Sequence, residues 1–226
     1  MIYLIGGPPK CGKTTLAKKL SKKLGIQWVA SDTLQVVSRQ YTSKHISKQE
    51  LDKLYPHSAL RQETNDKTYS FNTPKQIAKN YIKQAKASYD AIDMFSICEI
   101  TDGNDYIIEG YHVTPKLAAK LIKKYGRKHF RILFIIKEDP KKFVQDIKKS
   151  STPNDWILSR TKDPKTFCKI AEMVTYYSQF FSKEAKIHRF PIINMDKNFN
   201  GQLKKAMKLL TPTHETTPHI HHHIPL

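Results

Sequence analysis

The stretch IYLIGGPPKCGKTTLAKKL, residues 2–20, decides the fold of this chain. From Gly7 it matches the pattern G-x-x-x-x-G-K-[ST] without a break, and Lys13 and Thr14 close the pattern. The residues before it form a short apolar run typical of a buried strand, and the leucines after it recur every fourth residue, as in a helix. Because this motif holds phosphate only where a strand turns into a helix, the sequence predicts a phosphate-binding loop of the Walker A type.

Each position of this loop has an expected role. Backbone N–H groups between Pro9 and Thr14 are expected to converge on two phosphates at the start of a helix, whose dipole adds to their attraction. Lys13 is expected to reach the β- and γ-phosphates, and the Thr14 hydroxyl to bind Mg²⁺, while Cys11 serves as a small spacer that points away. The predicted nucleotide-binding residues are Gly7, Lys10, Cys11, Gly12, Lys13, Thr14 and Thr15.

Composition places the chain among globular proteins. With 226 residues, 39% of them hydrophobic, we expect a single domain with a sizeable core. No apolar run approaches the roughly 20 residues that span a membrane, so the expected location is the cytoplasm. Three widely spaced cysteines indicate neither a disulfide framework nor a zinc site.

The net charge of +19 has two explanations that the sequence leaves open. Only six of the 39 basic residues are arginine, which is the side chain that favours bidentate phosphate contacts. A lysine-rich, solvated surface is therefore the favoured explanation. Attraction to nucleic acid or to an acidic membrane is the alternative.

Strands and helices are expected to alternate along the chain. The tripeptides at Thr73, Thr114, Asp139 and Asp163 each supply an N-cap residue followed by proline, which marks the start of a helix. The expected strands are 2–5, 26–30, 105–110, 129–136 and 190–195, and the expected helices are 14–24, 32–40, 74–101, 115–125, 140–149, 164–187 and 199–210. The pattern predicts an α/β fold with three layers, an open parallel sheet of about five strands covered by helices on both faces.

Three segments fall outside this alternation. Residues 41–72 are expected to form a helical cap over the sheet edge, on the acceptor side, and residues 150–163 offer a place for a lid. Residues 1–210 would then make one domain, followed by a disordered tail at 211–226. The histidines of that tail could bind a metal, but a solvated end is the favoured interpretation.

Two carboxylates are expected beside the phosphate-binding loop. Ligands of open α/β sheets lie beyond the carboxyl ends of the strands, where Asp32 follows the second expected strand and Glu109 closes the third. With the Thr14 hydroxyl they could share a magnesium ion and an attacking hydroxyl group, with Thr14 and Asp32 as predicted metal ligands. Asp32 could alternatively be a helix N-cap and nothing more.

These segments resemble a known family. Residues 2–20, 24–40 (LGIQWVASDTLQVVSRQ), 54–59 (LYPHSA) and 105–115 (DYIIEGYHVTP) are similar in order and spacing to the P-loop small-molecule kinases, and most similar to 2-phosphoglycerate kinase. The resemblance implies a five-stranded parallel core, ATP and Mg²⁺ as cofactors, and a small phosphoryl acceptor held between the second and third strands. It also assigns catalytic roles to Lys13, Asp32 and Glu109, and an acceptor-side position to Gly110.

The resemblance has departures and weaker parts. Gln35 stands where the family pattern generally has a basic residue, and the segment HVTP lacks the expected glycine. Arg160 lies where such kinases place a basic lid residue that neutralises the transferring phosphate. Candidates to hold an anionic acceptor are Arg39, His57, Arg61 and His112, each with an ordinary structural role as the alternative.

Two rival functions remain at this point. A polynucleotide 5′-kinase would also combine this loop with an aspartate after the next strand, and the positive charge would suit a nucleic-acid end. A nucleotide-binding regulatory protein would use the loop without turnover. The sequence determines neither the acceptor nor the oligomeric state.

Overall fold

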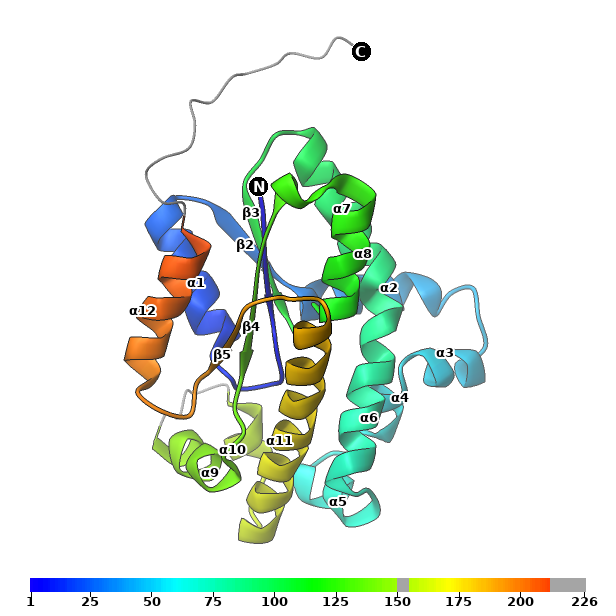
Figure 1. Ribbon diagram of the computed structural model, residues 1–226. Coiled ribbons are helices and arrows are strands. Elements are labelled where there is room, and N and C mark those ends of the chain that lie inside the picture. Colours follow the sequence, from blue (N-terminus) through cyan, green and yellow to red (C-terminus); the bar gives the residue numbers. More distant parts are fainter. Residues whose placement is uncertain (150–154, 212–226) are drawn as a thin grey trace.

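Five parallel strands form the centre of the molecule, in the order β2-β3-β1-β4-β5 (Figure 1). The computed structural model describes residues 1–149 and 155–211. The strands are β1 (Ile2–Gly6), β2 (Gln27–Ala30), β3 (Tyr106–Gly110), β4 (Phe130–Ile136) and β5 (Ile192–Asn194). The register pairs Glu109 of β3 with Ile5 on one side and with Ala30 on the other. The carboxyl ends of β1, β2 and β3 therefore meet at one edge of the sheet, next to the phosphate-binding loop.

Helices cover both faces of the sheet, which confirms the expected three-layer α/β fold. α1 (Lys13–Leu24) and α12 (Phe199–Leu210) lie together on one face. α7 (Tyr89–Thr101), α8 (Pro115–Tyr125) and α11 (Pro164–Ile187) cover the other. α6 (Pro74–Ala85) packs along α11, and α9 (Pro140–Lys149) and α10 (Trp156–Arg160) lie at the carboxyl end of the sheet.

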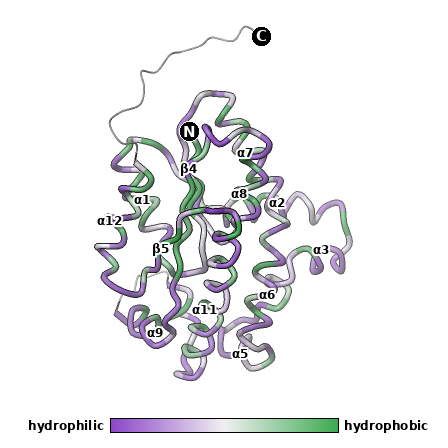
Figure 2. Tube along the Cα trace, in the orientation of Figure 1, coloured by the Kyte–Doolittle hydropathy of each residue, from purple (hydrophilic) through white to green (hydrophobic). Residues whose placement is uncertain are grey.

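The core explains why these elements form. All five residues of β1 are buried, as are six of the seven in β4, so these central strands are apolar on both sides as parallel strands require. Figure 2 shows this hydrophobic centre surrounded by hydrophilic helix faces. Each of the four Thr-Pro or Asp-Pro signals marks a helix start, at Pro74, Pro115, Pro140 and Pro164.

The prediction of one continuous helix over residues 74–101 was wrong. The segment 74–101 is broken by a 3-10 turn, η1 (Lys86–Ser88), into α6 and α7. α6 packs on α11, whereas α7 packs against β1 and α8, so the chain must change direction between them. The break falls at Ser88, whose backbone angles of φ −101° and ψ 1° depart from helical values. Neither glycine nor proline marks the break, so the sequence pattern does not predict it.

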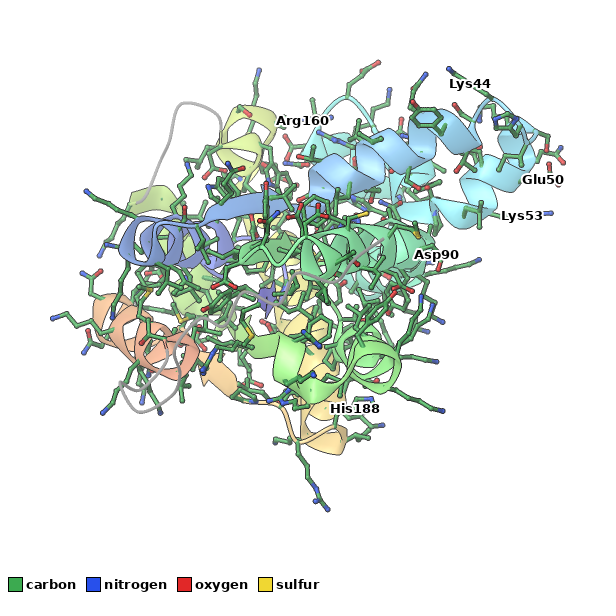
Figure 3. All side chains as sticks on the ribbon, turned by 90° about the horizontal axis from the view of Figure 1, so that it is seen from above. Lys44, Glu50, Lys53, Asp90, Arg160 and His188 are labelled. Carbon is green, nitrogen blue, oxygen red and sulfur yellow. The ribbon has the colours of Figure 1, made fainter. Side chains whose placement is uncertain are left out.

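Residues 31–71 build a helical projection from one side of the molecule. It contains α2 (Ser31–Thr42), α3 (Lys48–Leu54), α4 (Pro56–Leu60) and α5 (Asn65–Phe71). Figure 3 shows Lys44, Glu50 and Lys53 at its outer end. The expected helical cap is thus helical, and its role toward an acceptor stays a prediction.

Parts of the expected lid and tail lie outside the described residues, namely 150–154 and 212–226, and the histidine cluster falls among the latter. Among the residues that the structure describes, no helix is both long and apolar enough to cross a membrane.

Candidate active site

The phosphate-binding loop joins β1 to α1 as the motif predicts. Gly12 has φ +98°, in the left-handed region, and immediately precedes the first turn of α1. A Cβ atom there would also lie 2.8 Å from the Phe199 ring, so both the backbone conformation and the lack of space require glycine. The first N–H groups of a helix have no partner inside it, and those of Lys13 and Thr14 are consequently available to an anion at the loop.

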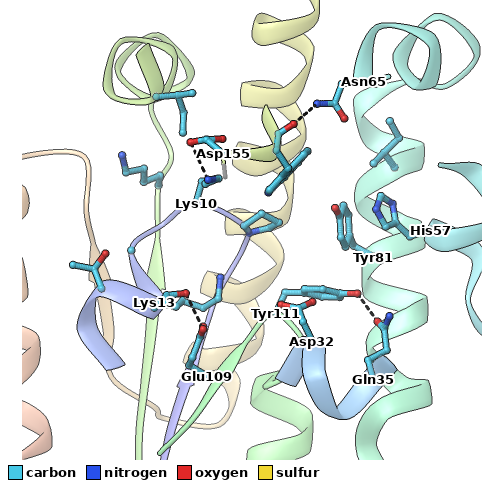
Figure 4. Close-up of a pocket in the computed structure, with 18 of the residues that line it drawn as sticks. Lys10, Lys13, Asp32, Gln35, His57, Asn65, Tyr81, Glu109, Tyr111 and Asp155 are labelled. Carbon is cyan, nitrogen blue, oxygen red and sulfur yellow. Dashed lines mark hydrogen bonds and ion pairs between the residues drawn. The ribbon is translucent and has the colours of Figure 1, made fainter. Parts of the chain in front are cut away.

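Lys13 and Glu109 lie close together at the carboxyl ends of the strands (Figure 4). Lys13 is buried and its Nζ donates to the Pro8 carbonyl at 2.6 Å, which curls the side chain over the loop. The Thr14 hydroxyl donates to Glu109 Oε1 at 2.7 Å. Burial raises the pKa of the Glu109 carboxyl, while the Lys13 charge and the Thr14 hydrogen bond oppose that rise.

Asp32 is the second carboxylate of the site, one residue into α2. Its side chain is accessible through the cavity but lies deep among protein atoms, and this burial raises the pKa of its carboxyl against the opposing charge of Lys13. Asp32 and Glu109 also repel one another, since the Asp32 charge contributes to the raised pKa of Glu109. The charge of Lys13 thus acts on both carboxylates and partly offsets their negative charge.

One cavity of about 1220 Å³ contains the loop and both carboxylates. Among the predicted residues, its lining includes Lys10, Gly12, Lys13, Thr14, Thr15, Asp32, Arg39, His57, Arg61 and Glu109. Ligand sites for one small molecule are typically about 300–1,000 Å³. The cavity therefore has room for a nucleotide and a second small molecule beside it.

The second half of the cavity is formed by α2, α4 and α6. Arg39 and Arg61 line it, and neither forms an ion pair within residues 1–149 and 155–211. His57 stacks on Tyr81 with ring centroids 3.6 Å apart (Figure 4). Burial lowers the pKa of His57 to about 3, with the nearby Arg61 charge acting in the same direction. This compartment thus offers two unpaired guanidinium groups beside a neutral imidazole.

Four predicted site residues are not among those that line the cavity. Cys11 is fully buried, and burial raises the pKa of its thiol to about 11, consistent with the expected spacer. Gly7 meets the Ile135 carbonyl, where a Cβ would come within 2.0 Å. Gly110 has φ +149°, and a Cβ there would meet Ser31 Oγ at 1.8 Å, so this glycine allows β3 and α2 to approach one another. His112 is fully buried and bonds Ser31 and Gln35 behind the cavity wall.

The fold also directs Arg160 away from the cavity. Its guanidinium donates to the backbone carbonyls of Gln62 and Glu63, and it is not among the lining residues. In this arrangement its donors are engaged by the segment before α5, and the role of Arg160 toward a transferring phosphate stays a prediction. Lys137, in contrast, lines the cavity at the end of β4 and pairs with Asp146 at 2.6 Å.

Several lining residues were not singled out from the sequence. Asp155 is buried and forms an ion pair with Lys10 of the loop at 2.9 Å, which links the loop to the start of α10 (Figure 4). Tyr81, Gln84 and Tyr111 shape the second compartment. Only the spacing of Tyr81 and Gln84 on α6, and the position of Tyr111 directly after β3, could have indicated them, and both features equally fit a core.

Oxygen ligands suited to Mg²⁺ converge at the site. The Thr14 hydroxyl, bonded to Glu109, and the nearby Asp32 carboxylate form the all-oxygen donor set that this hard cation prefers. Within residues 1–149 and 155–211, no group of three acidic, histidine or cysteine side chains gathers as a dedicated metal cage. The arrangement fits a magnesium ion that arrives with phosphate oxygens, as Mg²⁺ commonly does.

Comparisons with known proteins agree with this geometry. The model of the ATPase family associated with various cellular activities (AAA) matches residues 3–135, from β1 into β4. A 2-phosphoglycerate kinase of Methanopyrus kandleri is 24% identical over 196 residues, which cover 86% of this chain and 56% of that protein. A 2-phosphoglycerate kinase of Pyrococcus horikoshii is 28% identical over 163 residues, covering 70% and 50% respectively. The chain thus spans about half the length of the curated relatives it matches.

A solved structure supports the fold independently. Shikimate kinase from Bacteroides thetaiotaomicron superimposes with a TM-score of 0.51 over 93% of this chain and 98% of that one, at 13% identity. At this identity the likeness concerns the arrangement of the sheet and helices alone.

Proposed function

This chain belongs to the ATPase family associated with various cellular activities (AAA), and on that premise we propose that it is an ATP-dependent kinase of a small molecule. The acceptor that we propose is a small anionic hydroxy compound, with 2-phosphoglycerate as the first to test. The two 2-phosphoglycerate kinases among its relatives support this choice. Each of those proteins is about twice as long as the segment that matches this chain.

One observation carries the proposal, namely that a single cavity joins the phosphate-binding loop to a second compartment lined by Arg39 and Arg61. A protein that only bound or hydrolysed a nucleotide would need no second compartment. The Asp32 carboxylate lines the same cavity as the loop and the two arginines, so an acceptor hydroxyl that enters the cavity could reach it. This combination suits transfer to an organic acceptor better than transfer to water.

The proposed reaction assigns a role to each side chain. The acceptor oxygen attacks the γ-phosphorus of ATP, the bond to the β-phosphate oxygen breaks, and ADP leaves with that electron pair. Asp32 accepts the proton of the attacking hydroxyl, and Lys13 offsets the negative charge that spreads over the transferring group. Thr14 and Asp32 would hold Mg²⁺, which would supply positive charge to offset that of the phosphates. Glu109 orients Thr14 through their hydrogen bond.

The experiment that tests this function measures ADP formation by the purified protein with ATP and Mg²⁺. The panel contains 2-phosphoglycerate, glycerate, other small hydroxy and phosphorylated acids, nucleosides, nucleotides and 5′-hydroxyl oligonucleotides. Turnover stimulated by a small acid supports the proposal. Stimulation by oligonucleotides alone would favour the polynucleotide kinase, and tight ATP binding without stimulation by any compound would favour a regulatory protein.

A further inference from the structure

A chain of side-chain hydrogen bonds runs along the wall of the second compartment. The Ser58 backbone N–H donates to Gln84 Oε1 at 2.9 Å, and Gln84 Nε2 donates to Gln35 Oε1 at 2.9 Å. The Tyr111 hydroxyl donates to the same Gln35 oxygen at 2.7 Å and accepts from Gln84 Nε2 at 2.9 Å. The chain thus connects α4 and α6 to Gln35 of α2.

The direction of this chain is fixed at its first bond. A glutamine can exchange its oxygen and nitrogen by rotating its amide, so each orientation must be justified by its partners. A backbone N–H can only donate, so Gln84 must present its oxygen to Ser58 and its nitrogen to Gln35. Gln35 must then accept this hydrogen bond with its oxygen, since two amide nitrogens cannot form a hydrogen bond with one another.

His112 supports the same orientation from the other side of Gln35. Its Nε2 lies 2.5 Å from Gln35 Oε1, and its Nδ1 lies 2.8 Å from Ser31 Oγ. The ring is fully buried and burial lowers its pKa to about 3, so it is neutral and carries one N–H. With Nε2–H donating to Gln35, Nδ1 accepts from the Ser31 hydroxyl, so both ring nitrogens of His112 have a partner.

These bonds all fall on the oxygen of Gln35 and leave its amide nitrogen unused. Gln35 lines the cavity, and within the described parts of the chain its Nε2 has no hydrogen-bond partner and is not sealed from solvent. Asp32 lies three residues earlier on the same helix, so both side chains project from one face of α2. We propose that Gln35 Nε2 donates to an acceptor oxygen adjacent to the hydroxyl that Asp32 activates.

This inference rests on the proposed function and narrows its substrate class. The acceptor would be a small acid with an oxygen substituent on the carbon next to its reacting hydroxymethyl group. A site built to bond an oxygen discriminates against an analogue that lacks it, because the donor is then left unpaired. Gln35 would thus be a specificity-determining residue, at a position where the resemblance led us to expect a charged side chain.

The first test examines the orientation of Gln35 without turnover. In the ¹⁵N-labelled protein, the side-chain amide signals of Gln35 and Gln84 are assigned from their loss in Gln35→Glu and Gln84→Glu. We expect the Gln35 amide protons to exchange with water at least about 10-fold faster than those of Gln84, whose nitrogen donates twice. Equal protection of the two amides would overturn the inference.

The second test compares two matched probes, D-glycerate and 3-hydroxypropionate. They differ only in the hydroxyl group that glycerate has on the carbon next to its hydroxymethyl group. Preference for glycerate is measured by kcat/KM, or by calorimetric binding in the presence of MgADP. We expect this preference to fall at least about 10-fold in Gln35→Glu, which keeps an oxygen toward Gln84, Tyr111 and His112 but loses both donors. Gln35→Met should show the same loss without an added charge.

Gln40→Glu is the matched control, because Gln40 is an exposed residue of the same helix. It should retain the wild-type preference. An unchanged preference in both Gln35 variants would overturn the inference while leaving the kinase intact. Absence of turnover with every acceptor would instead contradict the proposed function, and the exchange and binding measurements would still decide the role of Gln35.

Discussion

The chemistry of the site depends on the balance among Lys13, Asp32 and Glu109. Burial raises the pKa of both carboxyls, and the single positive charge of Lys13 opposes the rise at each. One ammonium group cannot fully offset two carboxylates, so added negative phosphate would be held mainly by the helix terminus, by the loop amides and by metal. The lysine is consequently needed for electrostatics more than for packing.

Replacing Lys13 by alanine should therefore abolish transfer without unfolding the protein. We expect kcat to fall by about 10²–10³-fold or more, the range found when one preorganised electrostatic contact is removed. Acceptor-stimulated ADP formation and circular dichroism measure the two effects. Lys22→Ala is the control, because Lys22 is exposed on the same helix. Wild-type turnover in Lys13→Ala would refute the assignment of the site.

The raised pKa of Asp32 predicts an acid limb in the pH–rate profile. A base must be ionised to accept a proton, so kcat/KM should fall as the pH drops through the raised pKa, which lies above the ordinary value of 3.8. Asp32→Asn should lower kcat/KM by about 10²–10⁴-fold and remove this limb. An unchanged limb in that variant would assign the titration to Glu109, whose pKa is also raised.

At the scale of elements, α10 is held to α5 and the residues before it. Buried Asn65 donates from Nδ2 to Thr161 Oγ1 at 2.9 Å and to the Trp156 carbonyl at 3.2 Å. Asp66 accepts from the Lys162 backbone N–H at 2.8 Å. Because Asp155 also pairs with Lys10, this small assembly connects the phosphate-binding loop to the wall of the second compartment.

Asn65→Ala should loosen both sides of this connection together. It leaves the buried Thr161 hydroxyl and the part-buried Trp156 carbonyl without this donor, at a local cost of about 1–3 kcal/mol. We expect faster hydrogen exchange in residues 61–72 and 155–163, measured by mass spectrometry, with β1 and β4 unchanged. Asn104→Ala, at an exposed turn, provides the control. Faster exchange on one side alone would show that the two segments open independently.

Elements and site differ in how far the sequence could predict them. The strands, the proline-led helix starts and the residues of the phosphate-binding loop follow from local rules, because each depends on neighbours in the chain. The walls of the second compartment do not. Gln35, Gln84 and Ser58 are joined across 49 and 26 residues of sequence by single hydrogen bonds, and no periodicity records such contacts. The contacts of Arg160 could not be predicted for the same reason, since its partners lie 97 and 98 residues away.

For the whole molecule, the charge of +19 is spread over exposed helix faces. α1 and α12 contain eight lysines and no acidic residue, and of these only Lys13 is buried. Such surfaces attract polyanions weakly and in a salt-dependent way, which fits a lysine-rich solvated surface as well as a binding face. Overall charge therefore says less about the acceptor than the uncharged network around Gln35 does.

The stability of the whole fold should decline in mild acid because of buried His112. The folded pKa is about 3 and the ordinary value is 6.5, so below pH 6.5 the unfolded chain binds a proton that the folded chain excludes. Stability from this group is present above pH 6.5 and is lost as the pH falls toward 3, by about 1.4 kcal/mol per pH unit. His57, with a pKa lowered to about 3, adds a second contribution of the same sign. Urea unfolding at pH 5.0–7.5 measures the slope, which should become shallower in His112→Gln, a variant that can still bond Ser31 and Gln35. An equally steep slope in that variant would show that His112 is not the group that titrates.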